Sequence, residues 1–349
     1  MRRELLVLLA LSAPALPAAA EEVPDLKDWV VRCDNVRYCV ALGLEKEDAV
    51  EGAFLRLTRS AAALAEPTIE VVTATTTPGR YRIRLAFDDP ALASPILLDA
   101  GEPDENDTVR AQIPQEAVAP FVEGLRRGKV LHVTQLQGDA ETLTARIGLD
   151  EAPQALAHLD EAQGRGGTTN ALAAPGDKAP AGPAADPELP VVVAAKPVGS
   201  RPAPGTPKAV ARLLRTADCD EPPNVRPIRE RLDARTSLWG FLCWRGAYNE
   251  TYAFFVYREG ENRAAPAVFQ YATLRGEEPD SNTLTNPDFG RKALTMGFFD
   301  LGRGVGDCGQ AGRYVWDGRQ FALLELTSMP ACRGVSLPDW PATWRARMR

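Results

Sequence analysis

The six cysteines of this sequence could serve three different chemical roles, because a cysteine can bind a metal, carry out a redox reaction or form a disulfide. They stand at Cys33, Cys39, Cys219, Cys243, Cys308 and Cys332. No pair has the C-x-x-C spacing used by zinc sites and thioredoxin-like redox sites, and the chain has two histidines to offer as further ligands. We therefore predict structural disulfides, and no metal or other cofactor.

Neighbours along the chain give the simplest pairing of these cysteines. Two of them stand close together in the stretch VRCDNVRYCV, and the other four lie in the second half of the chain. Four cysteines in one domain allow three connectivities, so the pairing of the second half is a preference among three. Local pairing joins Cys33 to Cys39, Cys219 to Cys243 and Cys308 to Cys332.

The first residues have the pattern of a secretory signal peptide, residues 1–20. Two arginines precede an apolar run from Leu5 to Leu11, and small residues at Ala18 and Ala20 predict cleavage near Ala20. The run is too short to span a bilayer, although an uncleaved N-terminal anchor is the alternative. No later stretch predicts a membrane span, so we expect a periplasmic or secreted protein. Disulfides persist in such an oxidising compartment.

Composition and charge exclude some partners. Hydrophobic residues make up 45% of the chain and charged residues 25%, which is typical of a globular protein. The formal net charge is −7. Nucleic acids and anionic membrane surfaces both require a basic surface, so we expect no nucleic-acid partner.

The chain from Trp29 to about Ile147 alternates apolar and polar residues with a period of two. Short runs such as RYRIRLAF, bounded by Gly, Pro or Asp, predict a half-buried antiparallel sheet or sandwich. The segment PQEAVAPFVEGLRRG predicts a helix ended by Gly128, and Asp150 would cap a second helix, EAPQALAHLDEAQ. These patterns predict an N-terminal β domain with a closing helix over residues 21–167.

Composition shifts to Ala, Pro and Gly over residues 168–207, which predicts a flexible linker. Within it, VVVAAKPV could pair as an isolated strand. Thr206 would cap a helix with Pro207 at its first position, and strand patterns dominate to the chain end. The fold class we predict is mainly β with a few short helices. Two antiparallel, sandwich-like β domains would be joined by the linker, the second of them disulfide-stabilised and covering residues 208–349.

Three patterns resemble functional motifs but have simpler interpretations. GRGVGDCG matches G-x-G-x-x-G with Gly304, Gly306 and Gly309, yet a strand pattern follows where a dinucleotide site needs a helix. His132 and His158 stand near no G-x-S-x-G nucleophile motif, so we place them on a strand and a helix. One loop carries oxygen ligands suited to calcium but lacks EF-hand spacing: Glu277, Glu278, Asp280, Asn282 and Asp288.

Carboxylates and aromatic side chains supply the remaining candidates. Asp300, Asp307 and Glu325 could provide the carboxylate pair of a glycosidase, although many exported proteins offer such pairs. The second half is rich in aromatic residues, most of which core packing explains. The alternative is an exposed platform for a glycan or a partner protein. The residues proposed for it are Trp244, Tyr248, Tyr252, Trp316, Trp340 and Trp344.

Five stretches resemble a known family. They are DWVVRCDNVRYCVAL, LAHLDEAQGRGGTTNAL, CWRGAYNETYAFFV, GRGVGDCGQAGRYVWDGRQFAL and MPACRG with WPATWRA. Together they are similar to the exported, six-cysteine bacterial family numbered 1176 among domains of unknown function. The first domain also resembles the invasion-associated locus B family. The first resemblance implies export without an activity, and the second implies a β-sandwich at the cell envelope or host surface.

These observations favour a non-catalytic binding or interaction module of the bacterial envelope, with an envelope protein or glycan as partner. The first alternative is a carboxylate-dependent hydrolase of envelope glycans. The second is a host-surface interaction protein, which depends on the weaker of the two resemblances.

Overall fold

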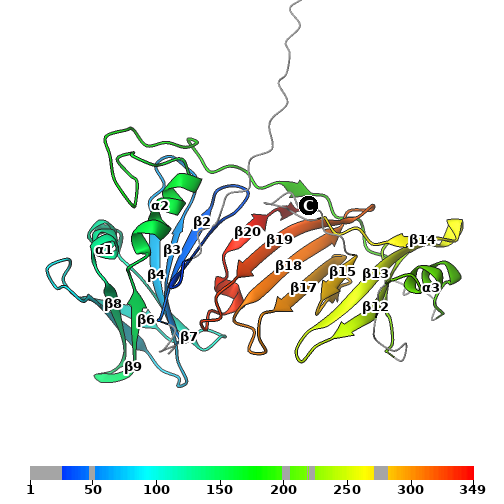
Figure 1. Cartoon of the computed structure of the whole chain (residues 1–349), viewed down its shortest axis with the longest axis horizontal. Helices are drawn as coiled ribbons and strands as arrows, with labels where there is room; N and C mark the ends of the chain where they lie inside the picture. The colour runs from blue at the N-terminus through cyan, green and yellow to red at the C-terminus, as the bar shows by residue number, and fades with distance from the viewer. Residues whose placement is uncertain (1–25, 47–51, 199–204, 218, 220–224, 271–281) are drawn as a thin grey trace, which may run out of the picture.

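A computed structural model describes residues 26–46, 52–198, 205–217, 219, 225–270 and 282–349. The predicted signal peptide, residues 1–20, lies outside these ranges. Among the described residues, no helix is long and apolar enough to cross a membrane. The prediction of a mainly β fold with a few short helices is confirmed (Figure 1).

Two antiparallel sheets form the first half of the molecule (Figure 1). Sheet 1 has the strand order β1-β2-β3-β4-β7: Trp29–Cys33, Cys39–Leu44, Ala53–Arg59, Thr68–Ala74 and Thr108–Gln112. Sheet 2 has the order β6-β5-β8-β9: Ile96–Gly101, Tyr81–Phe87, Val130–Gln137 and Ala140–Gly148. β5 buries Tyr81, Ile83 and Leu85 while exposing Arg82 and Arg84, so the period-two prediction is confirmed there.

Two helices pack on these sheets, as predicted. α1 spans Gln115–Arg127 and α2 spans Ala152–Ala162. The predicted cap of α2 is wrong, because the residue before the helix is Glu151 rather than Asp150. The Glu151 side chain makes no capping bond and instead accepts a hydrogen bond from the backbone N–H of Asp28, 3.0 Å away. This contact ties the helix start to the beginning of sheet 1.

The second half has two further antiparallel sheets, which meet where β15 lies beside β17 (Figure 1). Sheet 3 has the order β16-β17-β18-β19-β20: Asp288–Gly290, Thr295–Leu301, Gly309–Trp316, Phe321–Met329 and Ala342–Arg345. Sheet 4 has the order β11-β12-β13-β14, with β15 also paired to β13: Ile228–Arg231, Thr236–Arg245, Glu250–Arg258, Arg263–Pro266 and Thr283–Thr285. Helix α3 covers Lys208–Leu214, and short 3-10 turns cover Glu259–Glu261 and Leu337–Asp339. Pro207, not Thr206, immediately precedes α3, so that predicted cap is also wrong.

The described part of the predicted linker is packed against both halves of the molecule, which differs from the expectation of a flexible segment. Ala171 and Leu172 are buried, and the Ala63 N–H donates to the Pro183 carbonyl at 2.7 Å. β10, Val191–Val192, pairs in parallel with β21, Arg347–Met348, so the isolated strand is confirmed. Small residues permit this packing: a Cβ added to Gly182 would lie 2.7 Å from the carbonyl oxygen of Ala61.

Sheet 1 is buried on both faces. One face, with Ala41, packs on sheet 2 and the two helices. The other face, with Val40, Leu42 and Phe54, packs on residues of the second half. Every residue of β2 is therefore buried. The partners from the second half are Phe299, Ala311, Met329, Ala331, Val335 and Trp340.

Ion pairs border this apolar contact between the halves. Arg110 in β7 donates two hydrogen bonds to the carboxylate of Asp339, at 2.6 and 2.7 Å. Asp339 is buried, whereas Arg110 is partly exposed, so this bidentate pair lies at the edge of the contact. Arg345 forms a second ion pair, with Asp34 of the first half. The two halves are thus joined by both hydrophobic packing and matched charges.

We expect Arg110→Met to lower the free energy of unfolding by about 3 kcal/mol, because it leaves the buried Asp339 carboxylate without its main cation. Chemical denaturation followed by circular dichroism measures this. Arg84→Met is the matched control: Arg84 forms an exposed pair with Glu141, which is worth about 0–1 kcal/mol. Equal losses in the two variants would contradict the role assigned to the Arg110–Asp339 pair.

Candidate functional site

All six cysteines form disulfides in the pairs that local pairing favours: Cys33–Cys39, Cys219–Cys243 and Cys308–Cys332. No free cysteine is present. Asp307 lies close to the sulfurs of Cys308 and Cys332, but sulfurs joined to each other supply no thiolate ligand. The sulfurs therefore act as cross-links in this structure.

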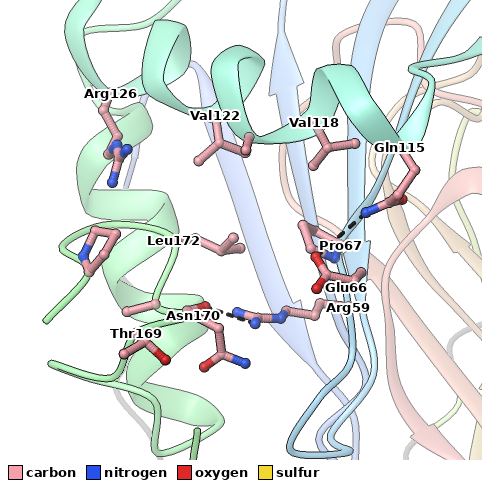
Figure 2. A pocket seen from close by; sticks show the side chains of 13 residues that line it. Arg59, Glu66, Pro67, Gln115, Val118, Val122, Arg126, Thr169, Asn170 and Leu172 are labelled. Atoms are coloured by element: carbon pink, nitrogen blue, oxygen red, sulfur yellow. Dashed lines mark hydrogen bonds between the residues drawn. The ribbon is translucent and has the colours of Figure 1, made fainter. Parts of the chain in front are cut away.

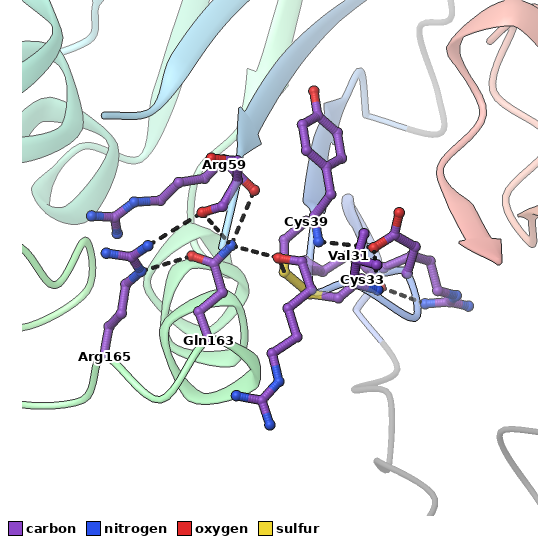
Figure 3. Close-up of a disulfide and its surroundings, with 12 residues drawn as sticks. Val31, Cys33, Cys39, Arg59, Gln163 and Arg165 are labelled. Carbon is purple, nitrogen blue, oxygen red and sulfur yellow. Dashed lines mark hydrogen bonds between the residues drawn. A yellow bond between two sulfur atoms is a disulfide. The ribbon is translucent and has the colours of Figure 1, made fainter. Parts of the chain in front are cut away.

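The Cys33–Cys39 disulfide closes a loop that contacts both halves of the molecule (Figure 3). The Gln163 amide, just after α2, donates to the carbonyl oxygens of Arg37 and Arg59 at 2.9 and 3.0 Å. On the other side, Asn35 exchanges two hydrogen bonds with the backbone of Arg345. The Arg345 guanidinium lies 4.6 Å from the centre of the Tyr38 ring. The loop between the cysteines is a joint between the halves.

Among the described residues, the glycine motif, the histidines and the acidic loop do not form a common site. Gly304 and Gly306 lie in the turn before β18, and Gly309 opens that strand, so a strand follows as predicted. Only glycine fits position 309, because an added Cβ would lie 2.0 Å from the carbonyl oxygen of Asp300. His132 lies in β8 and His158 in α2, both half-buried.

Part of the acidic loop lies outside the described residues, namely Glu277, Glu278 and Asp280. Asn282 uses its side-chain amide to donate to the carbonyl oxygen of Phe254, at 2.6 Å. Asp288 begins β16.

The three candidate carboxylates are held in separate interactions. Asp300 lies opposite Gln310 in β18, whereas Glu325 lies opposite Arg313. Positions 310 and 313 are an odd number apart in one strand, so the two carboxylates project from opposite faces of sheet 3. Because they lie on opposite faces of the sheet, Asp300 and Glu325 cannot both contact one substrate bond.

The Asp307 carboxylate is held in a structural ion pair. Arg303 donates to both of its carboxylate oxygens, and the Gly334 N–H donates to one of them at 2.7 Å. Burial alone would raise the pKa of Asp307, but the hydrogen bonds from Arg303 and Gly334 outweigh it and lower the pKa. An acid with a lowered pKa stays ionised at neutral pH, which suits an ion pair and not proton donation to a leaving group.

The six candidate aromatics divide between core and surface. Trp316 and Trp340 are buried in two different core clusters, so their assignment to a binding surface is wrong. Both are large apolar rings on inward-facing positions, which core packing favours. Tyr252 and Trp344 are half-buried against the core between sheets 3 and 4. The most exposed pair is Trp244 and Tyr248, at 36% and 45%.

Tyr248 lies in the turn of the β12–β13 hairpin and is held there by the neighbouring loop. Its hydroxyl donates to the carbonyl oxygen of Gly302 at 3.2 Å, and Gly304 lies beside its ring. The Asn249 amide donates to the Leu301 carbonyl at 2.9 Å and accepts from the Leu301 N–H at 3.2 Å. Val305 in the same loop is 77% exposed. We call Trp244, Tyr248 and Val305 the tip patch.

A pocket in the first half escaped the sequence analysis (Figure 2). Its volume is about 280 Å³, and it lies between α1, the ends of β3 and β4, and the segment after α2. The lining combines apolar with charged and amide side chains, which come from segments far apart in the sequence. The main lining residues are Arg59, Glu66, Gln115, Val118, Val122 and Leu172.

The floor of the pocket contains a buried charge cluster. Arg59 has a side chain that is 2% exposed and lies 3.5 Å from Asp160. Arg165, fully buried nearby, donates to backbone carbonyls of residues 60–63. Burial first, and then the charge of Arg165, lowers the pKa of Arg59 to about 10. Burial likewise raises the pKa of Asp160. Two cations thus share one buried carboxylate.

The same charges shape the pocket walls. Arg165 holds the backbone of residues 60–63, which leads to Glu66. Asp160 accepts from the Ala173 N–H at 2.8 Å and fixes the opposite wall. In the sequence, the visible signs of this cluster are an arginine in a predicted buried strand and an aspartate in a predicted helix. Arg59 and Asp160 are 101 positions apart, so no local pattern shows that they are in contact.

We expect Asp307→Asn to lower the free energy of unfolding by about 1–2 kcal/mol at pH 7. The lowered pKa means that the stabilisation by Asp307 is present above its unfolded value of 3.8 and is lost as pH falls through the folded value. Denaturation curves for both proteins from pH 7 to pH 3 should therefore converge at acid pH. A gap that is constant across this range would contradict the ion-pair assignment.

Peptide mapping of the alkylated, non-reduced protein should recover Cys33 linked to Cys39 and no alkylated cysteine. Replacing both by alanine should lower the free energy of unfolding by about 2 kcal/mol, because the closed loop is short. Alkylation of either residue in the folded protein would show a reactive thiol in place of a cross-link.

Comparison with known proteins agrees with the first sequence resemblance. The family described as protein of unknown function (DUF1176) matches residues 23–347. The chain is 27% identical over 366 residues to the uncharacterized protein YpfG of Escherichia coli (strain K12), with 98% of each chain covered. No solved structure matches. The similarity to the invasion-associated locus B family stays a prediction. Since the family match spans both halves and the segment between them, the chain belongs to the DUF1176 family.

Proposed function

We propose that this protein is a non-catalytic binding protein of the bacterial envelope, which holds an envelope protein or glycan at the tip patch. The tip patch is the observation that carries the proposal. Exposed aromatic rings on a fixed backbone are typical of binding surfaces, because they bury a large area at little cost in side-chain entropy. The Tyr248 hydroxyl and the Asn249 amide provide that fixation.

Export to the envelope is part of the proposal, and the disulfides are consistent with it. Three disulfides in one chain suit an oxidising compartment. The predicted signal peptide, residues 1–20, and a division into domains over residues 21–167 and 208–349 are parts of the same proposal.

The positions of the three candidate carboxylates favour a binding function over hydrolysis. Asp307 is engaged by Arg303, and Asp300 and Glu325 project from opposite faces of one sheet. A hydrolase of envelope glycans would need two carboxyl groups that face each other across the scissile bond. The host-surface alternative depends on sequence resemblance alone, and no contact among the described residues favours it.

A photo-reactive amino acid placed at Tyr248 tests the proposal in living cells. We expect one dominant cross-linked product in the envelope fraction, and none from the same amino acid at Leu97. Leu97 is a matched control because it is an apolar side chain, 52% exposed, on β6 of the other half. Protease and glycan-digesting enzymes then identify the product as protein or glycan.

Purified protein gives the second arm of this test. Tyr248→Ala together with Trp244→Ala should weaken binding to the captured partner by about 10-fold or more, as expected for aromatic residues at the centre of an interface. Leu97→Ala should leave it unchanged. Products that are the same at positions 248 and 97, or absent at both, would rule out the tip patch as the binding site.

A further inference from the structure

The pocket of the first half is separate from the tip patch, and its lining offers three different kinds of contact (Figure 2). Arg59 supplies a cation at the floor, and Glu66 supplies an anion. Val118 and Val122 of α1 face Leu172 across the cavity and supply apolar walls. A ligand of this pocket should carry groups that are complementary to the cation, the anion and the apolar walls.

The guanidinium of Arg59 retains hydrogen-bonding capacity. Among the described residues it donates to the Ala65 carbonyl, the Asp160 carboxylate and the Asn170 carbonyl, at 3.0, 3.5 and 2.8 Å. A guanidinium has five N–H groups, so one N–H on each terminal nitrogen is left. These two donors suit a carboxylate, which accepts paired hydrogen bonds from arginine.

The charge balance beneath the pocket also favours an anion. Arg59 and Arg165 are both buried, and Asp160 is the buried carboxylate beside Arg59. The other carboxylates that act on the two arginines, Glu66 and Asp186, are exposed. Burial first, and then the like charge of Arg165, disfavour the ionised guanidinium and lower the pKa of Arg59 to about 10. Water screens the charges of exposed carboxylates, so an entering carboxylate would give Arg59 a closer counter-charge within the pocket.

Glu66 limits the class of anion that fits. Its exposed side chain lies 3.5 Å from the Gln115 amide, which donates to it. Its charge acts on Arg59 through space, so a simple anion bound at Arg59 would also meet this negative charge. A ligand that carries an ammonium group beside its carboxylate would satisfy both residues.

Size and apolar lining complete the description. A volume of about 280 Å³ is at the small end for ligand sites, so it holds a small molecule and not a polymer chain. Val118 and Val122 are buried within α1 and fixed by helix packing. They and Leu172 form a surface for a short apolar side chain.

We propose that this pocket binds a free α-amino acid with a small apolar side chain. The carboxylate bonds to Arg59, the ammonium group bonds to Glu66, and the side chain packs between Val118, Val122 and Leu172. The pocket is a binding site, and no bond of the ligand is made or broken in it.

Three probes of nearly equal shape test the assignment by isothermal titration calorimetry on the purified full chain. They are L-valine, 3-methylbutanoate, which lacks its ammonium group, and 2-methylpropylamine, which lacks its carboxylate. We expect valine to bind at least 10-fold more tightly than either analogue, because each charged contact contributes about that factor.

Two substitutions separate the two charged contacts. Glu66→Gln should weaken valine binding about 10-fold and leave 3-methylbutanoate binding unchanged or stronger. Because Glu66 is exposed, this change keeps the fold intact. Arg59→Met should abolish binding of both. Arg82→Met is the matched control on the exposed face of β5, and it should bind valine as the unchanged protein does.

Each contrary result overturns the proposal. Equal affinity for valine and 3-methylbutanoate would identify a plain carboxylate site and remove Glu66 from recognition. Unchanged valine binding in Glu66→Gln would do the same. Absence of binding by all three probes to the unchanged protein would exclude the pocket as an amino-acid site.

Discussion

The two buried faces of sheet 1 are the constraint on which the rest of the molecule depends. A sheet with one apolar face needs one partner layer, and a sheet with two needs a partner on each side. Sheet 2 with helices α1 and α2 covers one face, and residues of the second half cover the other. The first half therefore cannot bury its own apolar surface alone. The halves form one packed body, although each has sheets of its own.

Arginine side chains donate hydrogen bonds to backbone carbonyls in irregular segments, where no strand or helix pairs them. Arg165 binds four backbone carbonyls of the loop before Glu66. Arg333 binds the carbonyls of Lys27 and Glu45 across the contact between the halves. A planar guanidinium with five donors can satisfy several carbonyls that no strand or helix pairs. Arg59 does the same beneath the pocket, where it donates to the carbonyls of Ala65 and Asn170.

Local patterns predicted much of the fold. Alternation predicted strands such as β5, and helical spacing predicted α1 and α2. Nearest-neighbour pairing predicted the disulfides. These features depend on contacts within or between adjacent segments. The cap assigned to Asp150 failed because the helix start is fixed by a tertiary contact, from Glu151 to Asp28.

Features made by distant contacts could not be predicted in the same way. The continuous apolar run of β2 indicates burial without revealing what covers each face. The Ala-, Pro- and Gly-rich composition after residue 168 suits a flexible chain, but small residues also permit close backbone packing. Exposed and buried tryptophans look alike in sequence, so Trp316 and Trp244 could not be told apart. The pocket depends on Arg59 meeting residues about a hundred positions away.

The covering of sheet 1 by residues from 299 onward has a consequence for how the chain reaches its native state. A ribosome makes Val40, Leu42 and Phe54 long before it makes their partners Met329 and Trp340. Through most of synthesis, one apolar face of a finished sheet has nothing to pack against. Exposed apolar sheet surface of this kind invites association between chains. A holding factor, or delayed folding, would protect this face until the covering residues have been made.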